Sequence, residues 1–322
     1  VQGMLEMIQN IVSEIRTSNS FLLTSHESPD GDAIGSTLAL ASFLRKIGKD
    51  VYVHFCDPVP ELYAFLPGTE NVHSRIPDRD FDVAFVLDIG ELRRAGDVFC
   101  RFTRSKKLIN LDHHLGCEPF GAYNLIDPDA AATGVLVHRI VSEFGYSFDK
   151  ETAICLYVSI ITDTGSFRYS NSNREAFSIA GEMIGCGINA WDVAEQIYEN
   201  QPLKRLELLA LAINTLEVIK EGLAASLTVT LDMYVKTGAD AELTDGFVNY
   251  PRSIRGVEVA IFFRQTDERR YKVGFRSKGK VNVAEFAAIL GGGGHHNAAG
   301  CTVDGTLDEV KSKVYSIMES FH

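Results

Sequence analysis

The sequence predicts an α/β protein with two domains. The expected N-terminal domain has a doubly wound, mainly parallel sheet, and a helical linker joins it to a smaller C-terminal α+β domain. Three observations support this prediction. Short apolar runs alternate with helical patterns in the first half, and the pattern changes towards the end of the chain. The length of 322 residues also exceeds what one hydrophobic core usually supports.

The first half of the chain reads as alternating strands and helices. Strands are expected at the short β-branched or apolar runs 21–25, 51–55, 83–88 and 107–112. Helical periodicity covers 33–48 and stops at Gly48, a residue typical of helix ends. Helices are then expected over 133–145, 151–162 and about 174–200. Such alternation is typical of a parallel sheet covered by helices on both faces.

A different pattern follows Pro202 and the leucine-rich stretch 203–216, which read as a helical connector. Strands are expected over 223–232, 257–265 and 271–277, then a helix over 281–290, a glycine loop, and a last strand and helix. We therefore place one domain at 1–190, a helical linker at 191–222 and a second domain at 223–322.

Composition narrows the class of protein. No apolar run approaches the roughly 18 residues of a membrane span, and the first twenty residues lack a basic signal-peptide start. The six cysteines are widely spaced, with no C-x-x-C pair, as expected for reduced thiols in a cytoplasmic protein. The net charge of −12 disfavours a long nucleic-acid-binding face but leaves room for a short phosphorylated substrate.

The first group of candidate metal ligands follows the expected strand 21–25. His26, Asp30 and Asp32 lie within seven residues, at the turn into the helix 33–48. Open α/β sheets bind ligands outside the carboxyl ends of their strands, so a site is expected here. Aspartate is also a favoured helix cap, so this group alone leaves a structural role open.

Two single carboxylates end later elements. Asp88 closes the strand 83–88, where an aspartate can also simply begin a turn. Asp163 follows the apolar helix 151–162. A carboxylate at a helix C-terminus opposes the helix dipole, and a nearby cation explains that position.

Asp112, His113 and His114 end the strand 107–112. Consecutive side chains of an extended segment point to opposite sides. One histidine is therefore expected to ligate a metal while its neighbour faces the substrate or supports the ligands.

Together these groups predict a metal site. Carboxylate and imidazole suit Mn²⁺, Fe²⁺ or Zn²⁺ better than Ca²⁺, and the absence of cysteine disfavours a structural zinc site. Four carboxylates supply a charge of −4, which balances two divalent ions. These carboxylates are Asp30, Asp32, Asp88 and Asp163. The residues thus point to two divalent metal ions held at one site.

The same residues resemble the motifs of the DHH phosphoesterase superfamily, which is known for dinuclear Mn²⁺ sites. HESPDGD (26–32), Asp88, DHH (112–114) and TDTGSF (162–167) look like its four ordered motifs. FRSKG (275–279) and VNVAEFAAILGGGGHHNAAG (281–300) resemble the glycine-rich signature of the DHH-associated domain. In its length and in this C-terminal motif, the sequence most resembles the nanoRNase and 3′-phosphoadenosine-5′-phosphate phosphatase group.

The resemblance implies a role for each residue at the site. Two divalent ions would share Asp88. Mn²⁺ is the expected metal, and Mg²⁺, Co²⁺ or Fe²⁺ are the alternatives. One ion would also bind His26 and Asp30, and the other would also bind Asp32, His113 and Asp163. The catalytic set would be Asp88 with His114, which would touch the scissile phosphate, and Asp112, which would support the histidines.

In the second domain the implied substrate-binding residues are Arg276, Ser277, Gly293, Gly294 and His295. Glycine lets the backbone approach a phosphate, and a guanidinium pairs with two phosphate oxygens. A flexible loop and a surface charge are the simpler interpretations of these glycines and this arginine. Three further residues receive no role: Arg94, Arg168 and His296.

The predicted function is hydrolysis of short oligoribonucleotides, 3′-phosphoadenosine-5′-phosphate, or both, by a metal-activated water. The first domain would be catalytic and the second would bind substrate. Other interpretations stay open: a cyclic or linear dinucleotide phosphodiesterase, an exopolyphosphatase or pyrophosphatase, and a non-enzymatic, metal-dependent nucleotide sensor. No long duplex nucleic acid and no membrane are expected as partners, and a homodimer stays open.

Overall fold

The computed structural model describes residues 2–319, and the chain divides into two compact units. Unit 1 is Val1–Asn200 and unit 2 is Gln201–His322. The division falls inside the stretch 191–222, which the sequence predicts to be a helical linker. None of the helices in the described part of the chain is long and apolar enough to cross a membrane.

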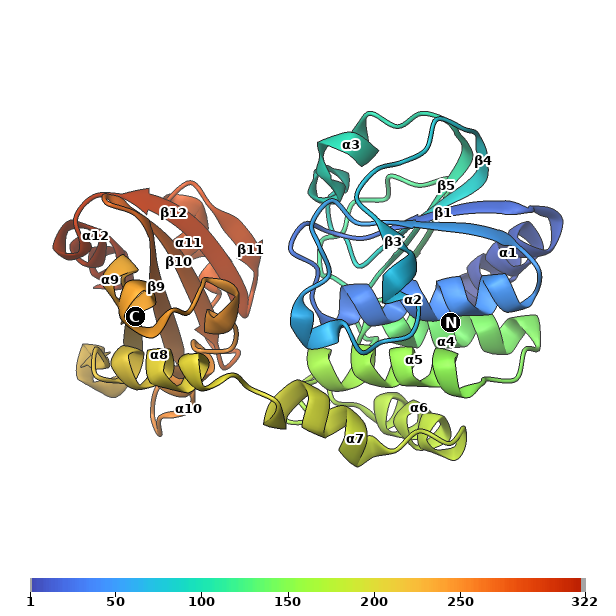
Figure 1. The fold of residues 1–322 in the computed structure, drawn as a ribbon. Helices are drawn as coiled ribbons and strands as arrows, with labels where there is room; N and C mark the ends of the chain where they lie inside the picture. The colour runs from blue at the N-terminus through green and yellow to red at the C-terminus, as the bar shows by residue number, and fades with distance from the viewer. Residues whose placement is uncertain (1, 320–322) are drawn as a thin grey trace. The chain divides into compact units, whose positions relative to one another are not determined.

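Unit 1 is built on a six-stranded sheet with the strand order β3-β2-β1-β4-β5-β6, in which all neighbouring strands are parallel (Figure 1). Its strands are β1 (Ser20–Thr24), β2 (Asp50–His54), β3 (Val72–His73), β4 (Phe81–Leu87), β5 (Ser105–Asp112) and β6 (Tyr123–Ile126). Its helices are α1 (Gln2–Thr17), α2 (Gly31–Lys46), α3 (Gly96–Cys100), α4 (Thr133–Phe144), α5 (Lys150–Asp163), α6 (Arg174–Gly185) and α7 (Ala190–Ala194), with a π-helical turn at Glu195–Glu199. The predicted doubly wound parallel sheet is confirmed.

Both faces of this sheet are covered. Phe21 and Phe85 pack into the large core that includes residues of α1, α2 and α4. Their neighbours Leu22 and Val86 pack with Phe99 of α3 in a separate core. Alternate side chains of a strand point to opposite faces, which is why these strands read as continuous apolar runs. Burying each such side chain contributes roughly 1.5–3 kcal/mol.

Helices α2 and α5 pack against each other through small residues. A Cβ at Gly35 would lie 2.5 Å from the carbonyl oxygen of Cys155 and 2.9 Å from the backbone nitrogen of Ser159. A Cβ at Gly31 would lie 2.4 Å from Thr162 Oγ1. The two glycines therefore allow the start of α2 to approach the end of α5.

Two helix boundaries differ from the prediction for local reasons. Helix α2 begins at Gly31 because the Asp30 carboxylate accepts hydrogen bonds from the next backbone N–H groups. The predicted helical run 174–200 is interrupted after Gly185. There Gly187 has a φ of +92°, a conformation that favours glycine, and Asn189 caps α7. Helix α1 was not predicted.

Unit 2 has a second six-stranded sheet, with the order β11-β12-β10-β9-β8-β7. Neighbouring strands are antiparallel except β8 and β9, which are parallel. Its strands are β7 (Glu217–Ile219), β8 (Ala224–Val229), β9 (Val259–Asp267), β10 (Arg270–Ser277), β11 (Gly293–His295) and β12 (Ala298–Asp304). Its helices are α8 (Leu203–Ile213), α9 (Leu231–Thr237), α10 (Asn249–Ser253), α11 (Val283–Ile289) and α12 (Leu307–Glu319). The predicted α+β class is confirmed.

The glycine-rich stretch is only partly a loop, so the prediction of a glycine loop was wrong for its last residues. Gly293–His295 forms β11, which pairs with β12. Gly294 has a φ of +144°, and a Cβ there would lie 2.5 Å from the carbonyl oxygen of Ala298. Glycine normally weakens strands, and here it permits a close approach of two backbones.

Candidate metal centre

Asp and His side chains converge at the carboxyl end of the sheet in unit 1. They form three groups, and within each group the candidate ligand atoms lie within 4.8 Å of one another. The groups are His26, Asp30 and Asp88; Asp32, His113 and Asp163; and Asp88, His113 and His114. The structure thus brings together all the predicted metal ligands, and it places His114 beside them.

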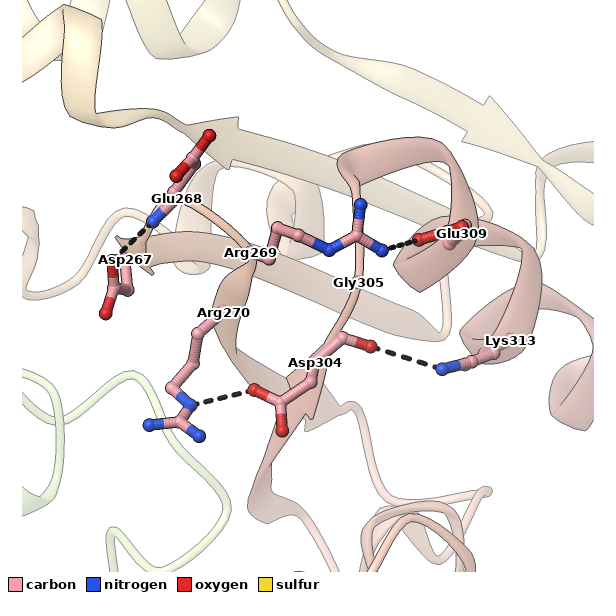
Figure 2. A pocket seen from close by; sticks show the side chains of 8 residues that line it. All are labelled: Asp267, Glu268, Arg269, Arg270, Asp304, Gly305, Glu309 and Lys313. Atoms are coloured by element: carbon pink, nitrogen blue, oxygen red, sulfur yellow. Dashed lines mark hydrogen bonds and ion pairs between the residues drawn. The ribbon is translucent and has the colours of Figure 1, made fainter.

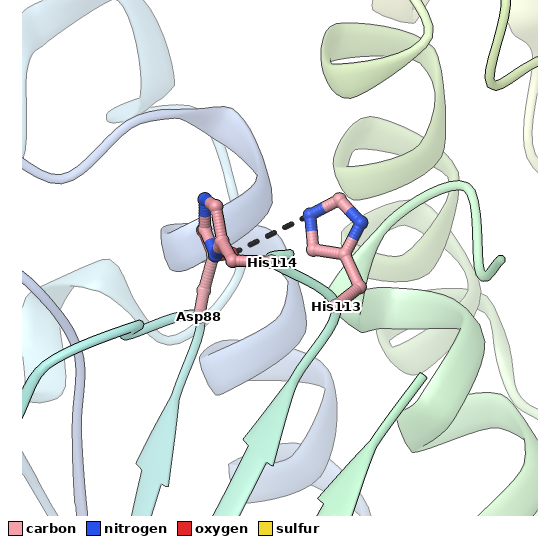
Figure 3. A group of neighbouring side chains, drawn as sticks. All are labelled: Asp88, His113 and His114. Carbon is pink, nitrogen blue, oxygen red and sulfur yellow. Dashed lines mark ion pairs between the residues drawn. The ribbon is translucent and has the colours of Figure 1, made fainter. Parts of the chain in front are cut away.

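Asp88 contacts histidines through both of its carboxylate oxygens. Its Oδ2 lies 3.6 Å from His26 Nε2. Its Oδ1 lies 3.7 Å from His113 Nε2 and 3.6 Å from His114 Nδ1, and Figure 3 draws these three side chains together. The two oxygens face different histidines, an arrangement that would suit a carboxylate shared by two ions. Asp88 also has a φ of +61°, a strained conformation for a non-glycine residue. Such strain concentrates at functional sites.

Asp32 is held by residues outside its own helix. Its Oδ2 accepts a 2.7 Å hydrogen bond from the backbone N–H of Thr133, and its Oδ1 accepts hydrogen bonds from the Gly134 N–H and the Ser159 hydroxyl. Helix α4 has no side-chain cap at Ala132. The buried Asp32 carboxylate therefore takes the place of that cap, where the helix dipole favours negative charge.

His113 is oriented by a backbone carbonyl, and Asp163 by a side-chain amide. His113 Nδ1 lies 3.0 Å from the carbonyl oxygen of Ala130. When Nδ1 carries the proton, Nε2 is left facing Asp32 and Asp163, at 3.5 and 3.8 Å. The Asn171 amide donates a 2.9 Å hydrogen bond to Asp163 Oδ2. This is the usual arrangement of a histidine ligand and its supporting contacts.

His114 lies beside Asp112. Its Nδ1 is 2.6 Å from Oδ1 of the fully buried Asp112. The ring centroids of His113 and His114 are 5.1 Å apart, and both rings lie near Asp88. The two histidines therefore do not point to opposite sides, and both follow the last residue of β5, Asp112.

The cluster concentrates negative charge in a buried place. Burial, together with the charges of Asp88 and Asp30, raises the pKa of Asp163 to about 7 against the opposing charge of His113. Burial and the charge of Asp88 also raise the pKa of Asp32 well above its usual range. Burial alone would lower the pKa of His26, but its ion pair with Asp88 and the charge of Asp30 raise it to about 9. A divalent cation offsets the same charge, so the residues fit metal binding.

Three residues without a predicted role make local contacts. The carbonyl oxygen of Arg94 accepts a hydrogen bond from the backbone N–H of Glu27. The Arg168 guanidinium donates to the carbonyl oxygen of Gly165 at 2.7 Å. His296 Nε2 lies 2.9 Å from the carbonyl oxygen of Gly279.

The predicted substrate-binding residues all lie in unit 2. Arg276 and Ser277 end β10, and the buried Ser277 hydroxyl donates to the side-chain oxygen of Asn297 at 2.9 Å. Gly293 and Gly294 are exposed in β11. The backbone of His295 completes this strand, while its side chain lies outside the described part of the chain.

A hollow in unit 2 is lined by charged side chains that pair with each other (Figure 2). Arg269 donates to Glu309 and Arg270 donates to Asp304, at 2.9 and 2.8 Å. Lys313 donates to the carbonyl oxygen of Asp304. Since these cations already have partners, the hollow offers a phosphate little, and we assign it no site.

Sequence reasoning missed the residues that hold the ligands in place: Thr133, Ser159 and Asn171. One signal was available. Ala132 precedes the helix 133–145 and cannot cap it, so a carboxylate from elsewhere was to be expected at its start. Nothing local in the sequence marked the other two residues.

The fold and the cluster define the class of the protein, a metal-dependent phosphoesterase. The model of the N-terminal domain of the DHH family matches residues 20–160, and the model of the DHHA1 domain matches residues 225–320. The chain belongs to the DHH family and carries a DHHA1 domain.

Two relatives are named bifunctional oligoribonuclease and PAP phosphatase NrnA. The protein of Thermus thermophilus is 33% identical over 295 residues, which cover 91% of this chain and 87% of that protein. The protein of Bacillus subtilis is 27% identical over 301 residues, which cover 92% and 93%. The crystal structure of an exopolyphosphatase-related protein from Bacteroides fragilis matches with a TM-score of 0.92 at 30% identity, covering 98% of this chain and 96% of that chain.

Proposed function

We propose that this protein hydrolyses short oligoribonucleotides and 3′-phosphoadenosine-5′-phosphate with two divalent ions. Mn²⁺ is the metal that we propose for both positions. The observation that carries the proposal is the pair of candidate ligand groups on either side of Asp88. The relatives named as oligoribonuclease and PAP phosphatase support this substrate class over the alternatives.

Each ion would have its own ligands and would share Asp88 with the other. One would be held by His26 and Asp30, and the other by Asp32, His113 and Asp163. The distances of the two Asp88 oxygens to His26 and His113 support this division. Bound there, divalent ions supply Lewis-acid chemistry, which draws charge from the phosphate and lowers the pKa of water.

His114 is the group of this chain that would touch the scissile phosphate. Burial alone would lower its pKa, but the hydrogen bond to Asp112 and the charge of Asp88 raise it. With Nδ1 held by Asp112, a protonated His114 presents its Nε2–H as a donor to a phosphate oxygen. Asp112 thus positions His114, and no serine or cysteine nucleophile is needed.

We assign metal chemistry to the domain 1–190 and substrate binding to the domain 223–322, with 191–222 as the linker. Ser277, Gly293, Gly294 and His295 would line the binding site for the nucleotide, with Arg276 on its terminal phosphate. The support is the glycine-rich signature and the match to the DHHA1 domain.

Replacing Arg276 with glutamine is expected to raise KM for a short oligoribonucleotide about 10- to 100-fold, with a smaller change in kcat. The reason is the loss of a bidentate hydrogen bond between the guanidinium and a phosphate group, which is worth about 1.5–3 kcal/mol. Steady-state kinetics would measure this. The control is Arg270→Gln on the same strand β10, where the guanidinium pairs with Asp304. Equal effects of both changes would contradict the role of Arg276.

Product analysis in the presence of Mn²⁺ tests the function itself. The protein would be offered labelled ribo-oligonucleotides of two to five residues, 3′-phosphoadenosine-5′-phosphate, a cyclic dinucleotide and polyphosphate side by side. Mononucleotides from the short RNAs and phosphate from the bisphosphate are expected, and both are lost when a chelator removes the metal. If the protein instead cleaved polyphosphate or the cyclic dinucleotide faster, that compound would be the substrate and the proposed substrate class would be wrong. Thermal stabilisation by nucleotide without any product would indicate a sensor.

We also propose a cytoplasmic location, which the free state of all six cysteines supports. A homodimer is the assembly to test by light scattering.

A further inference from the structure

Thr133 contacts two of the clustered carboxylates at once. It is the first residue of α4 and is fully buried. Its hydroxyl donates a 3.1 Å hydrogen bond to Asp88 Oδ1, and its backbone N–H donates a 2.7 Å hydrogen bond to Asp32 Oδ2. One residue that is not itself a candidate ligand therefore links a carboxylate after β4 to a carboxylate at the start of α2.

The hydroxyl contact determines how the Asp88 carboxylate is rotated. With Oδ1 held on the side of His113 and His114, Oδ2 is left facing His26. Without this hydrogen bond, the carboxylate could turn about its Cβ–Cγ bond, and its oxygens would no longer face defined partners. The contact with Asp32 has a different origin, because it uses the backbone and survives replacement of the side chain.

The residues just before Thr133 hold other parts of the same centre. The carbonyl oxygen of Ala130 faces His113 Nδ1 at 3.0 Å. The carbonyl oxygen of Ala131 accepts a hydrogen bond from the Asn171 amide, which also donates to Asp163. These hydrogen bonds fix the start of α4 relative to His113 and Asp163. They therefore also fix the position from which the Thr133 hydroxyl contacts Asp88.

We propose that Thr133 is a positioning residue that presets the orientation of Asp88 for metal binding. The inference rests on the two-ion centre proposed above. Because Asp88 belongs to both ligand sets, loss of the hydroxyl weakens the binding of both ions. Outer hydrogen-bond partners of metal ligands are typically worth about 10- to 100-fold in metal affinity, and this range is expected here.

The test is a Mn²⁺ titration of the full-length, metal-free protein, in which the electron paramagnetic resonance signal of free Mn²⁺ reports binding. Thr133→Val and Thr133→Ala both remove the hydroxyl and keep the backbone N–H that reaches Asp32. Both are expected to bind Mn²⁺ about 10- to 100-fold more weakly than the wild type. Thr133→Ser keeps the hydroxyl and is expected to restore the affinity. Two different hydroxyl-free variants guard against a local packing defect in either one.

Thr152→Val is the matched control. Thr152 is also fully buried near the start of a helix, and its hydroxyl donates to Ser42 at 3.1 Å, at the opposite end of α5 from Asp163. This change is expected to lower Tm while Mn²⁺ affinity stays unchanged. Wild-type affinity in Thr133→Val, or an equal loss in Thr152→Val, would overturn the role of Thr133. A wild type that binds no Mn²⁺ would overturn the proposed metal centre and, with it, this inference.

Discussion

Hydrolysis of a short oligoribonucleotide is expected to fall by at least about 10³-fold when Asp88 is replaced by asparagine. Metal assistance is worth several kcal/mol at the transition state, and each 1.36 kcal/mol corresponds to a tenfold change in rate. Asparagine keeps the size of the side chain but removes its charge. It also replaces one oxygen with an amide nitrogen, which does not bind a cation. Since the two Asp88 oxygens face different histidines, either orientation of the amide disrupts one ligand group.

Single-turnover assays at saturating Mn²⁺ would measure this loss, with Asp82→Asn as the control. Asp82 lies near the other end of β4 and accepts hydrogen bonds from the backbone N–H of Ser20 and from Lys106. Its replacement is expected to lower Tm and leave the rate constant unchanged. An Asp88→Asn protein that retains most of its activity would rule out a shared carboxylate at this position.

Gly35→Ala is expected to destabilise unit 1 by about 3 kcal/mol, which is large for the addition of one methyl group. The added Cβ would meet backbone atoms of α5, 2.5 Å from the Cys155 carbonyl oxygen and 2.9 Å from the Ser159 nitrogen. Side chains can rotate away from a clash, but backbone atoms move only if the helix moves. A shifted α5 would carry Ser159 and Asp163 with it, so weaker Mn²⁺ binding is expected as well.

Thermal and urea unfolding would measure the stability of this variant against a matched glycine. Gly181 also lies within a helix, α6, but a Cβ at this position would have no heavy atom within 4 Å outside its own helical turn, so alanine has room there. Gly181→Ala is expected to stabilise the protein by about 0.5–1 kcal/mol, because alanine favours the helix over the unfolded chain. If both variants were equally stable, the close packing of α2 on α5 would be refuted.

The strands and the candidate ligands were predictable because local sequence marks both. The apolar runs that became β4 and β5 are long enough to show that they are buried on both faces, and Asp88 and Asp112 stand at their ends. Shorter elements carry no such mark. Strand β3 has two residues and β7 has three, too few for any periodicity to appear.

The supporting contacts of the site could not be predicted in the same way. Ser159 donates to Asp32 across 127 positions of sequence, and Thr133 reaches the same carboxylate across 101. Many hydroxyl residues occur in the helices, and only the packing of α2, α4 and α5 selects these two. Sequence patterns identify residues by their chemistry and spacing, whereas the partners of a buried carboxylate depend on the tertiary fold.

Every candidate metal ligand lies between His26 and Asp163, in unit 1, whereas every predicted substrate-binding residue lies in unit 2, after Gln201. On the function proposed above, catalytic chemistry and choice of substrate would be encoded in two consecutive stretches of one gene. A recombination between the codons of Asn200 and Gln201 would exchange the second stretch and leave the candidate ligand set complete. New specificities can arise in evolution by such exchanges, without the slow rebuilding of a metal site.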